Sequence, residues 1–277
     1  MNYPRVFVII LNYNGGDILK KCLESVYKLK YPNFQVVVVD NNSADNSFEE
    51  AQLSFGKFNF IKNSQNIGFA GGNNVAIKWA LEKMADFVFL LNNDALVEKD
   101  TLDKLVFAAQ KDRSIGILSP VIYKDKSKNI WFSGGKIDWF KMKAIHQNDI
   151  RYTQYITGCA MLVRKEVFKK IGLLDEKFFL YYEDVDFSFR ARKNNFKLKI
   201  VSIAKVFHFE KSAESLNKFY FLVISGIIFF RKNSNLLLRI YIEVYLLLRK
   251  IKNRLDILKN KNNKVALIVR RAYREFR

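Results

Sequence analysis

Short apolar runs alternate with helix-like stretches through the first part of the chain. Runs typical of strands buried on both faces of a parallel sheet occur at residues 5–11, 34–39, 58–61 and 87–91. Apolar positions at helical spacing occur at residues 17–27, 43–55, 75–81 and 102–110. Strand and helix alternating in this order predict an α/β fold with a mostly parallel sheet and right-handed crossovers. Asp17 and Asp100 stand where they can cap two of these helices.

Polar residues follow three of the predicted strands directly. Asn12-Tyr13-Asn14 follows the first run, Asp40 follows the second, and Asn92-Asn93-Asp94 follows the fourth. In open α/β sheets, ligands bind beyond the carboxyl ends of the strands. We therefore expect these segments on one rim of the sheet, close to a polar, glycine-rich loop at residues 66–74.

The alternation fades after about residue 115 and gives way to shorter pieces. Strand-like segments are expected at residues 115–122, 130–132, 196–201 and 204–209, and helices at 165–171 and 183–193. The helix at 183–193 carries Glu183, Asp184 and Asp186 in its first turn, where the helix dipole favours acids. Crowded carboxylates resist burial, so such a cluster either faces water or serves a site that needs a carboxylate base.

A seam of apolar residues marks the last part of the chain. They recur at alternating steps of four and three, at Leu237, Tyr241, Val244, Leu248, Ile251, Leu255 and Leu258. This spacing predicts one apolar stripe along a long helix, more often packed against the protein than inserted in a membrane. We expect two parts, an α/β domain over 1–212 and a basic, amphipathic helical extension over 213–277.

The charge of the chain is positive and concentrated near its end. The net charge is +20, and residues 249–277 hold eleven Lys or Arg against two acids. Such a tail suits an anionic partner such as a membrane surface. We expect no nucleic-acid partner, because few aromatic residues accompany the charge. No signal peptide or membrane span is expected, and Cys22 and Cys159 are interpreted as buried thiols in a reducing compartment.

Three of these positions fit the chemistry of group transfer from a nucleotide diphosphate. Asp94 and His208 match the ligands that Mg²⁺ or Mn²⁺ accepts, and such a cation offsets charge on a leaving diphosphate. Asp184 has the chemistry of a base for an acceptor hydroxyl. Taken singly, each pattern is more often a turn, a cap or a core residue, and the glycine-rich segment lacks the Lys of a phosphate loop.

Taken together and in order, seven segments resemble the family 2 glycosyltransferases, and within them the rhamnosyltransferase-like branch. They include Val-Val-Val-Asp-Asn-Asn-Ser before residue 44 and Phe-Leu-Tyr-Tyr-Glu-Asp-Val-Asp before residue 187. The complete set is residues 8–14, 37–43, 66–74, 90–94, 157–164, 179–186 and His208. The resemblance implies a GT-A fold and an inverting transfer of a sugar from a nucleotide-diphosphate sugar, dTDP- or UDP-linked, to a hydroxyl.

The resemblance also implies roles for individual residues. Asp184 would be the catalytic base with Glu183 beside it, and Gly158 and Asp186 would lie on the acceptor side. The nucleotide sugar would contact Asn12, Tyr13, Asp40, Asn66 and Asn93. Asp94 and His208 would bind the divalent cation.

The chain departs from the family pattern at three places. Asn12 replaces the usual Thr, and the metal motif keeps only one acid, Asp94. The branch often carries an Arg-Asn pair in the helix after His208, whereas residues 223–226 here read Val-Ile-Ser-Gly. The role of that pair is therefore absent or moved.

Two other classes of function remain open at this stage. A nucleotidyltransferase would need a basic loop near the first strand, and residues 14–17 contain no Lys or Arg. A non-catalytic nucleotide-sugar or polyanion-binding protein would not need the carboxylates that are present. The leading hypothesis is a cytoplasmic enzyme of cell-surface polysaccharide synthesis, peripheral at the inner face of the membrane. Its acceptor would be a glycan or a lipid-linked intermediate, and the seam allows a homodimer.

Overall fold

The computed structural model describes residues 3–125, 127–209 and 216–276. Its strands are β1 (Val6–Asn12), β2 (Phe34–Asp40), β3 (Asn59–Lys62), β4 (Phe87–Asn92), β5 (Ala95–Val97), β6 (Ile115–Lys124), β7 (Ile130–Phe132), β8 (Gly135–Asp138), β9 (Lys143–His146), β10 (Ala160–Arg164) and β11 (Lys197–His208). Its helices are α1 (Asp17–Tyr27), α2 (Ser47–Ser54), α3 (Gly68–Glu82), α4 (Thr101–Lys111), α5 (Lys165–Ile171), α6 (Glu183–Lys193), α7 (Leu216–Asn233), α8 (Leu236–Lys259) and α9 (Lys264–Glu275).

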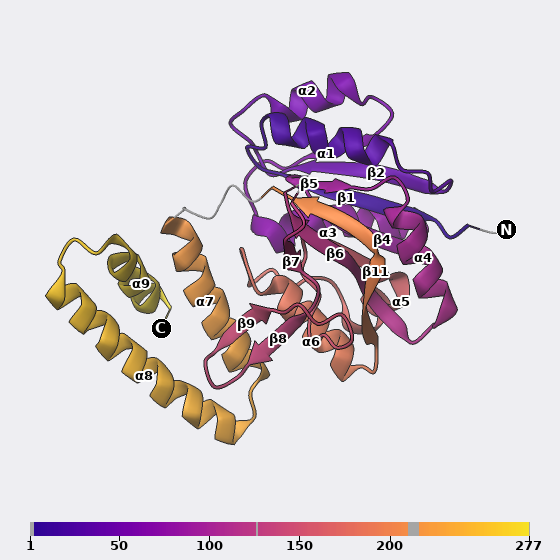
Figure 1. Ribbon diagram of the computed structural model, residues 1–277. Helices are drawn as coiled ribbons and strands as arrows, with labels where there is room; N and C mark the ends of the chain where they lie inside the picture. The colour runs from indigo at the N-terminus through magenta and orange to yellow at the C-terminus, as the bar shows by residue number, and fades with distance from the viewer. Residues whose placement is uncertain (1–2, 126, 210–215, 277) are drawn as a thin grey trace.

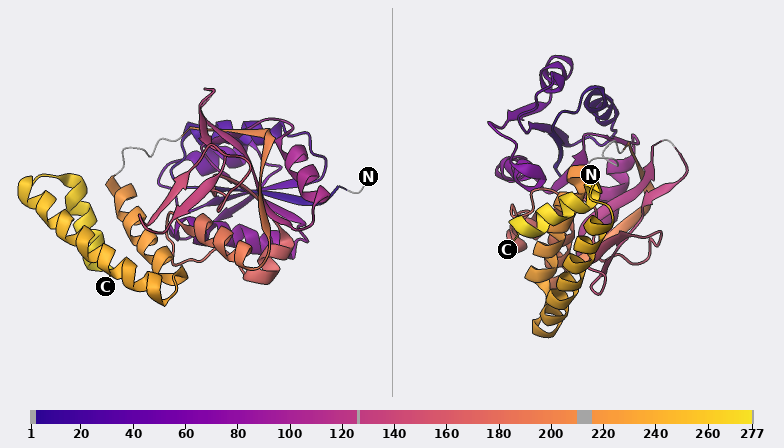
Figure 2. Two further views of the ribbon diagram at one scale, coloured as in Figure 1. Left: turned by 60° about the horizontal axis from the view of Figure 1, so that its bottom comes forward. Right: turned by 90° about the vertical axis from the view of Figure 1, so that its left-hand side faces the viewer.

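The described strands form a nine-stranded mixed sheet between two helical layers (Figure 1; Figure 2, left). Its order is β3-β2-β1-β4-β10-β6-β11-β5, with β7 beside β6, and β8 pairs with β9 in a separate hairpin. The first four strands of this order are parallel, as predicted. The sheet is mixed beyond them, because β10 runs antiparallel to both of its neighbours and β5 runs antiparallel to β11.

Burial explains why the apolar runs form the centre of the sheet. In β1 and β2, Val6–Ile10 and Val36–Val39 are almost completely inaccessible to solvent. Strands covered by helices on both faces need apolar residues at every position rather than at alternate ones. The parallel register pairs Asn12 with Asp40, and the polar ends of β1 and β2 therefore meet at one edge.

Several local predictions differ from the structure at the boundaries of elements. The glycine-rich stretch expected as a loop forms the first turns of α3, which begins at Gly68. Residues 196–201 and 204–209 form one strand, β11, with a register shift between Val201 and Lys205. Asp17 is the first residue of α1 rather than its cap, and Asp100 occupies the cap position of α4 without a capping hydrogen bond.

The three C-terminal helices stand beside the α/β domain as a separate layer (Figures 1 and 2). The boundary expected at residues 212 and 213 lies outside the described residues. Helix α8 packs on both α7 and α9, and its buried side chains include Ile242 and Leu246. The predicted apolar seam of α8 exists but lies on the opposite, exposed face, so the expectation that it would be packed was wrong. No described helix is long and apolar enough to cross a bilayer.

Candidate active site

The carboxyl ends of β1, β2 and β4 meet through the side chain of Asn12. Its Nδ2 donates to Asp40 Oδ1 at 2.9 Å, and its Oδ1 accepts from Asn93 Nδ2 at 3.1 Å. Asn12 and Asp40 are completely buried. The prediction that these strand ends share one rim is therefore confirmed, and Asn12 provides the link.

Asp40 orders the turn that follows β2. Its Oδ1 accepts hydrogen bonds from Asn12 and from Ser43 Oγ at 2.6 Å, and its Oδ2 accepts from the Ser43 backbone amide at 2.9 Å. All these donors belong to the protein. A ligand would meet the turn that Asp40 builds and would have to replace one of these bonds to reach the carboxylate itself.

Tyr13 is the exposed residue of this rim. It follows the buried Asn12, and half of its side chain surface is open to solvent, at 51%. The next residue, Asn14, has a positive φ of 52°, which Asn adopts more readily than most residues. The Asn14 amide donates to Ser43 Oγ, and Asn14 Oδ1 accepts from the Ala44 amide. The loops after β1 and β2 are thus joined, and the Tyr13 ring is left free for a ligand.

Asn66 supports the start of α3 rather than pointing freely into solvent. Its Oδ1 accepts from the Gly68 amide at 2.9 Å and from Asn41 Nδ2 at 3.2 Å. Gly68 has a φ of +79°, and a Cβ there would lie 2.5 Å from the Phe179 carbonyl oxygen. The Phe69 amide donates to that same carbonyl at 2.7 Å. Glycine at position 68 therefore lets the loop that leads to the acidic cluster approach α3 closely.

The three acids of the cluster have different surroundings. Asp184 is half-buried, and its Oδ2 accepts from the Gly158 amide at 2.8 Å while its Oδ1 accepts from the Val185 amide at 2.7 Å. Burial raises the pKa of the Asp184 carboxyl, and these hydrogen bonds only partly oppose the shift. Glu183 is buried, and burial together with the charge of Asp184 raises its pKa well above the usual value.

The backbone before this cluster is strained. Tyr181 and Tyr182 both have a φ of 67°, in the left-handed region that bulky residues rarely occupy. Each such residue costs on the order of 1–3 kcal/mol and persists only where the surroundings enforce it. Tyr182 Oη accepts from the Ala144 amide of β9, and Ser225 Oγ of α7 donates to the Leu180 carbonyl. The loop that presents Asp184 is thus held from two sides.

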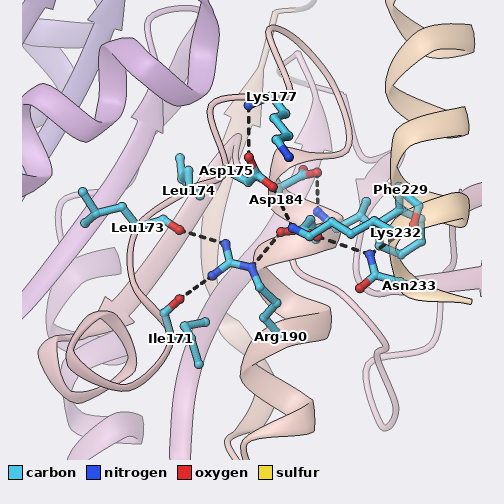
Figure 3. Close-up of polar contacts among 12 residues, drawn as sticks. Ile171, Leu173, Leu174, Asp175, Lys177, Asp184, Arg190, Phe229, Lys232 and Asn233 are labelled. Atoms are coloured by element: carbon cyan, nitrogen blue, oxygen red, sulfur yellow. Dashed lines mark hydrogen bonds and ion pairs between the residues drawn. The ribbon is translucent and has the colours of Figure 1, made fainter. Parts of the chain in front are cut away.

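Asp186 faces away from Asp184 and is completely buried. Its Oδ2 accepts from Arg190 Nε at 2.7 Å, and its Oδ1 lies 2.8 Å from Lys232 Nζ and 3.2 Å from Asn233 Nδ2. Figure 3 shows this network, in which Lys232 and Asn233 come from α7 and Arg190 reaches the carbonyl oxygens of residues 171 and 173. We therefore leave Asp186 out of the proposed acceptor site.

Lys232 and Asn233 are functional candidates that sequence reasoning missed. The Arg-Asn pair that the resemblance implies is absent at residues 223–226, whereas a Lys-Asn pair stands at the C-terminal end of the same helix. Its contact with Asp186 joins residues 46 positions apart. The signal that could have found it was a Lys-Asn pair in the helix that follows His208.

Asp94 and His208 lie side by side. The strand pairing of β5 with β11 places them together, and Asp94 Oδ1 is 3.1 Å from His208 Nε2. Burial disfavours the imidazolium, but Cys159 and Asp94 outweigh it and raise the pKa of His208 to about 11. His208 Nδ1 is buried without a hydrogen-bond partner among the described residues, and Asp94 Oδ1 has no neighbour of this kind there besides His208 Nε2. These atoms are suited to a ligand that the protein itself does not supply.

This pair fits a hard divalent cation that takes its other ligands from elsewhere. Two adjacent ligand atoms of an octahedral Mg²⁺ lie about 3 Å apart, close to the separation of Asp94 Oδ1 and His208 Nε2. Among the described residues, no group of three or more His, Cys, Asp and Glu lies close enough to form a complete metal site. Diphosphate oxygens and water would have to complete the coordination.

One short segment connects Asp184 to the end of β4. Gly158 donates its amide to Asp184, and the next residue, Cys159, accepts at its carbonyl from the Asn92 amide at 2.9 Å. A Cβ at position 158 would lie 3.1 Å from the Phe69 ring and 3.6 Å from Asp184 Cβ. Gly158 therefore lies where α3, α6 and the end of β4 converge.

The architecture defines the class of the protein. It resembles solved glycosyltransferase structures at a level that shows the GT-A fold alone. The mannosyltransferase PcManGT from Pyrobaculum calidifontis, in complex with GDP-Man and Mn²⁺, superposes with a TM-score of 0.65 at 16% identity. That match covers 85% of this chain and 66% of PcManGT. For S. aureus TarS 1–349, the TM-score is 0.59 at 19% identity, covering 99% of this chain and 92% of TarS.

The sequence comparison gives the family. Residues 7–172 match the model of glycosyl transferase family 2, and the chain belongs to that family. The hexosyltransferase Agl10 of low-salt glycan biosynthesis in Haloferax volcanii is 26% identical over 73% of this chain and 66% of its own length. The dTDP-rhamnosyl transferase RfbF of Shigella flexneri is 24% identical over 73% and 68%. The N-acetylglucosaminyl-diphospho-decaprenol L-rhamnosyltransferase of Mycobacterium tuberculosis is 24% identical over 73% and 75%.

Proposed function

We propose that this protein is an inverting glycosyltransferase of cell-surface polysaccharide synthesis. It moves a sugar from a dTDP- or UDP-linked donor to a hydroxyl of a glycan or lipid-linked acceptor. The observation that carries this proposal is the placement of Asp184, which two backbone amides fix beside Gly158. A fixed carboxylate with a raised pKa is suited to accept a proton from an acceptor hydroxyl near neutral pH.

The rim of β1, β2 and β4 is the proposed donor side. Tyr13 offers an exposed ring to the nucleotide base, and Asp40 with Asn12 builds the turn against which the ribose would lie. Asn93 bonds to Asn12, and Asn66 holds the start of α3. These residues would fix the position of the donor, and positioning supplies much of the rate gain in a bimolecular transfer.

Asp94 and His208 are the proposed ligands of Mg²⁺ or Mn²⁺. When bound, such a cation neutralises charge that develops on the leaving diphosphate. The mannosyltransferase neighbour was solved with GDP-Man and Mn²⁺, and the GalNAc-T7 neighbour with UDP, GalNAc and Mn²⁺. Glu183, buried beside Asp184, would shape the acceptor side.

The acceptor is proposed to be lipid-linked and the donor sugar to be rhamnose. The name of the M. tuberculosis relative pairs rhamnosyl transfer with a diphospho-decaprenol compound, and that of RfbF gives dTDP-rhamnosyl transfer. The positive charge of residues 249–277 would favour an anionic leaflet, which supports a site of action at the inner face of the membrane.

The test is a release assay with a panel of dTDP-, UDP- and GDP-sugars in Mg²⁺ or Mn²⁺. We expect one donor to give metal-dependent release of the nucleoside diphosphate. Asp184→Asn should lower the rate by about 10²–10⁴ while donor binding persists. Asp112→Asn is the matched control, because Asp112 is exposed and precedes β6 at the other end of the sheet. If the unchanged chain binds a donor but releases no nucleoside diphosphate, the result would instead indicate a non-catalytic nucleotide-sugar-binding protein.

A further inference from the structure

The exposed face of α8 is an apolar feature that the proposed reaction does not use. Six of its side chains share one stripe, at Leu237, Val244, Leu248, Ile251, Leu255 and Leu258, and each is 45% or more exposed. The opposite face is occupied, since Ile242 and Leu246 are buried and Asn253 donates to the Ala266 carbonyl of α9. Helix α8 is therefore packed within the protein on one face, while the stripe on its opposite face stays exposed. Helix α8 forms the outer edge of the helical layer (Figure 1).

Cations flank this stripe on both sides. Lys252 lies one turn from Leu248 and Leu255, and Arg254 lies one turn from Ile251 and Leu258; both cations are exposed. Lys and Arg can extend from such positions so that the apolar stem follows the helix and the charge reaches a polar boundary. An apolar stripe with a cationic border is the pattern of a helix lying in the plane of an anionic membrane surface.

The same charges disfavour a second copy of the chain as the occupant. A coiled-coil dimer gains specificity from opposite charges beside its seam. Helix α8 has only two acids, Glu243 and Asp256, against six Lys or Arg. Glu243 is already bound to Arg231 at 2.7 Å and to Arg239 at 2.9 Å within the chain. Two copies joined through the stripe would bring Lys252 and Arg254 of each chain close to like charges. Anionic lipid headgroups would instead neutralise them.

The apolar surface continues onto the α/β domain. Tyr241 of α8 donates its hydroxyl to the Phe140 carbonyl at 2.8 Å, and the two rings meet edge to face at 5.6 Å. Phe140 stands between β8 and β9 and is 69% exposed. In the same hairpin, the Ala144 amide donates to Tyr182 Oη, directly before Glu183 and Asp184. A few contacts thus connect the exposed surface to the loop that presents the proposed base.

We propose that the apolar stripe of α8, together with Phe140, inserts into an anionic bilayer surface. This inference rests on the proposed function only in assigning the lipid-linked acceptor as the reason for membrane contact. Insertion would hold the α/β domain at a fixed height and orientation, so that an acceptor anchored in the same leaflet meets Asp184 without diffusing through solution. Restricting the acceptor to a surface in this way raises its effective concentration at the site.

The test is flotation of the full chain with vesicles of phosphatidylcholine alone or mixed with phosphatidylglycerol. We expect binding to the mixed vesicles and much weaker binding to phosphatidylcholine. Leu248→Gln with Ile251→Gln should weaken that binding by about tenfold or more for each residue. Lys252→Gln with Arg254→Gln should weaken it about fivefold per charge and reduce the preference for phosphatidylglycerol. The matched control is Leu53→Gln with Met84→Gln, exposed apolar residues on the α/β domain.

A second readout locates the surface directly. Leu248→Cys and, as control, Leu53→Cys accept an environment-sensitive fluorophore in the folded chain, because Cys22 and Cys159 are both buried. We expect a blue shift on mixed vesicles for the label at position 248 and none at position 53. Unchanged vesicle binding by the stripe variants would overturn the inference. So would light scattering that shows a dimer of the full chain which the stripe variants dissociate.

The outcomes also separate this inference from the proposed function. Asp184→Asn should bind mixed vesicles as tightly as the unchanged chain while losing donor turnover. A chain that binds vesicles through α8 but turns over no donor would support the membrane inference and contradict the proposed transferase function. A chain that turns over a donor but does not bind anionic vesicles would support the transferase and overturn the membrane inference.

Discussion

Lys232 Nζ lies 2.8 Å from Oδ1 of the completely buried Asp186, so the end of α7 is bound to the acid two residues beyond Asp184. The same ammonium lies 2.7 Å from Asp175 Oδ2, and Arg190 binds the other oxygen of Asp186 (Figure 3). Helices α6 and α7 are therefore joined by charges that are screened only weakly by water. This relationship gives the C-terminal layer a direct part in holding the loop of the proposed base.

Lys232→Met should destabilise the protein by about 2 kcal/mol, between the values for exposed and fully buried ion pairs. Asp186 would keep Arg190 and Asn233 but would lose its strongest contact to α7. Urea unfolding at neutral pH measures the change. Lys62→Met is the control, because Lys62 and Glu49 form an exposed pair that should contribute much less to stability. Equal losses of stability in the two variants would show that the Lys232–Asp186 contact stabilises the protein no more than an exposed ion pair does.

A positioning role can be separated from simple stability. If α7 holds the base in place, Lys232→Met should lower kcat of the proposed transfer severalfold and leave donor KM nearly unchanged. Lys232→Arg keeps the charge and should recover most of the loss. A variant that loses stability without any change in kcat at a temperature where it remains folded would confine Lys232 to a structural role.

The strand ends could be predicted because two simple rules determine them. Continuous apolar runs form buried parallel strands, and parallel register carries the next polar residue of each strand to one edge. Asn12 and Asp40 meet for this reason. The first turns of α3 were predicted as a loop because glycine has a low helix propensity, yet close packing against Asn41 and Phe179 outweighs that propensity.

These rules could not predict contacts between segments that are far apart in the sequence. Periodicity shows which residues of α8 share a face, but only tertiary structure shows that α9 packs on the other face and leaves the stripe exposed. The pairing of Asp186 with Lys232 likewise depends on how α7 crosses α6. The locations of Asp184 and His208 were implied by family resemblance, and the roles of the site residues stay predictions.

Gly68→Ala should disturb the acidic loop and lower activity. The new Cβ would lie 2.5 Å from the Phe179 carbonyl oxygen, at a φ of +79° that alanine rarely adopts. We expect a loss of about 1–3 kcal/mol in stability, from backbone strain alone, and a larger effect if the loop cannot shift. Gly56→Ala is the control, because its Cβ would meet its nearest atom at an ordinary 3.7 Å. Thermal unfolding of both variants gives the comparison, and a neutral Gly68→Ala would mean that the loop adapts freely.

Asp94→Asn should weaken binding of Mn²⁺ in the presence of a nucleoside diphosphate. The amide keeps the shape of the side chain but removes the charge that sits 3.1 Å from His208. Because even the outer partners of metal ligands alter affinity by about 10–100-fold, the loss should be at least about tenfold. Electron paramagnetic resonance of free Mn²⁺, titrated with UDP or dTDP, measures it. Asp112→Asn should titrate like the unchanged chain, and the same result for Asp94→Asn would remove Asp94 from the metal site.

Glu183→Gln should make the protein more stable, increasingly so as pH rises. Burial and the charge of Asp184 raise the pKa of Glu183 in the folded chain well above 4.5, its ordinary value. The proton bound by the folded state stabilises it fully below pH 4.5, and this contribution is lost as pH rises through the folded pKa. Above that range, the unfolded chain ionises Glu183 freely, whereas the folded chain must either keep the proton or bury a charge.

Glutamine removes this penalty, so the stability difference between variant and unchanged chain should be smallest at acid pH. It should then grow in favour of the variant by up to about 1.4 kcal/mol per pH unit until the folded carboxyl ionises. Urea unfolding across this pH range gives the slope, with Glu166→Gln on the exposed surface as a control for replacing a glutamate. A stability difference for Glu183→Gln that does not change with pH would mean that Glu183 is ionised in the folded protein. Attraction to a cation, rather than burial, would then have to explain its place beside the proposed base.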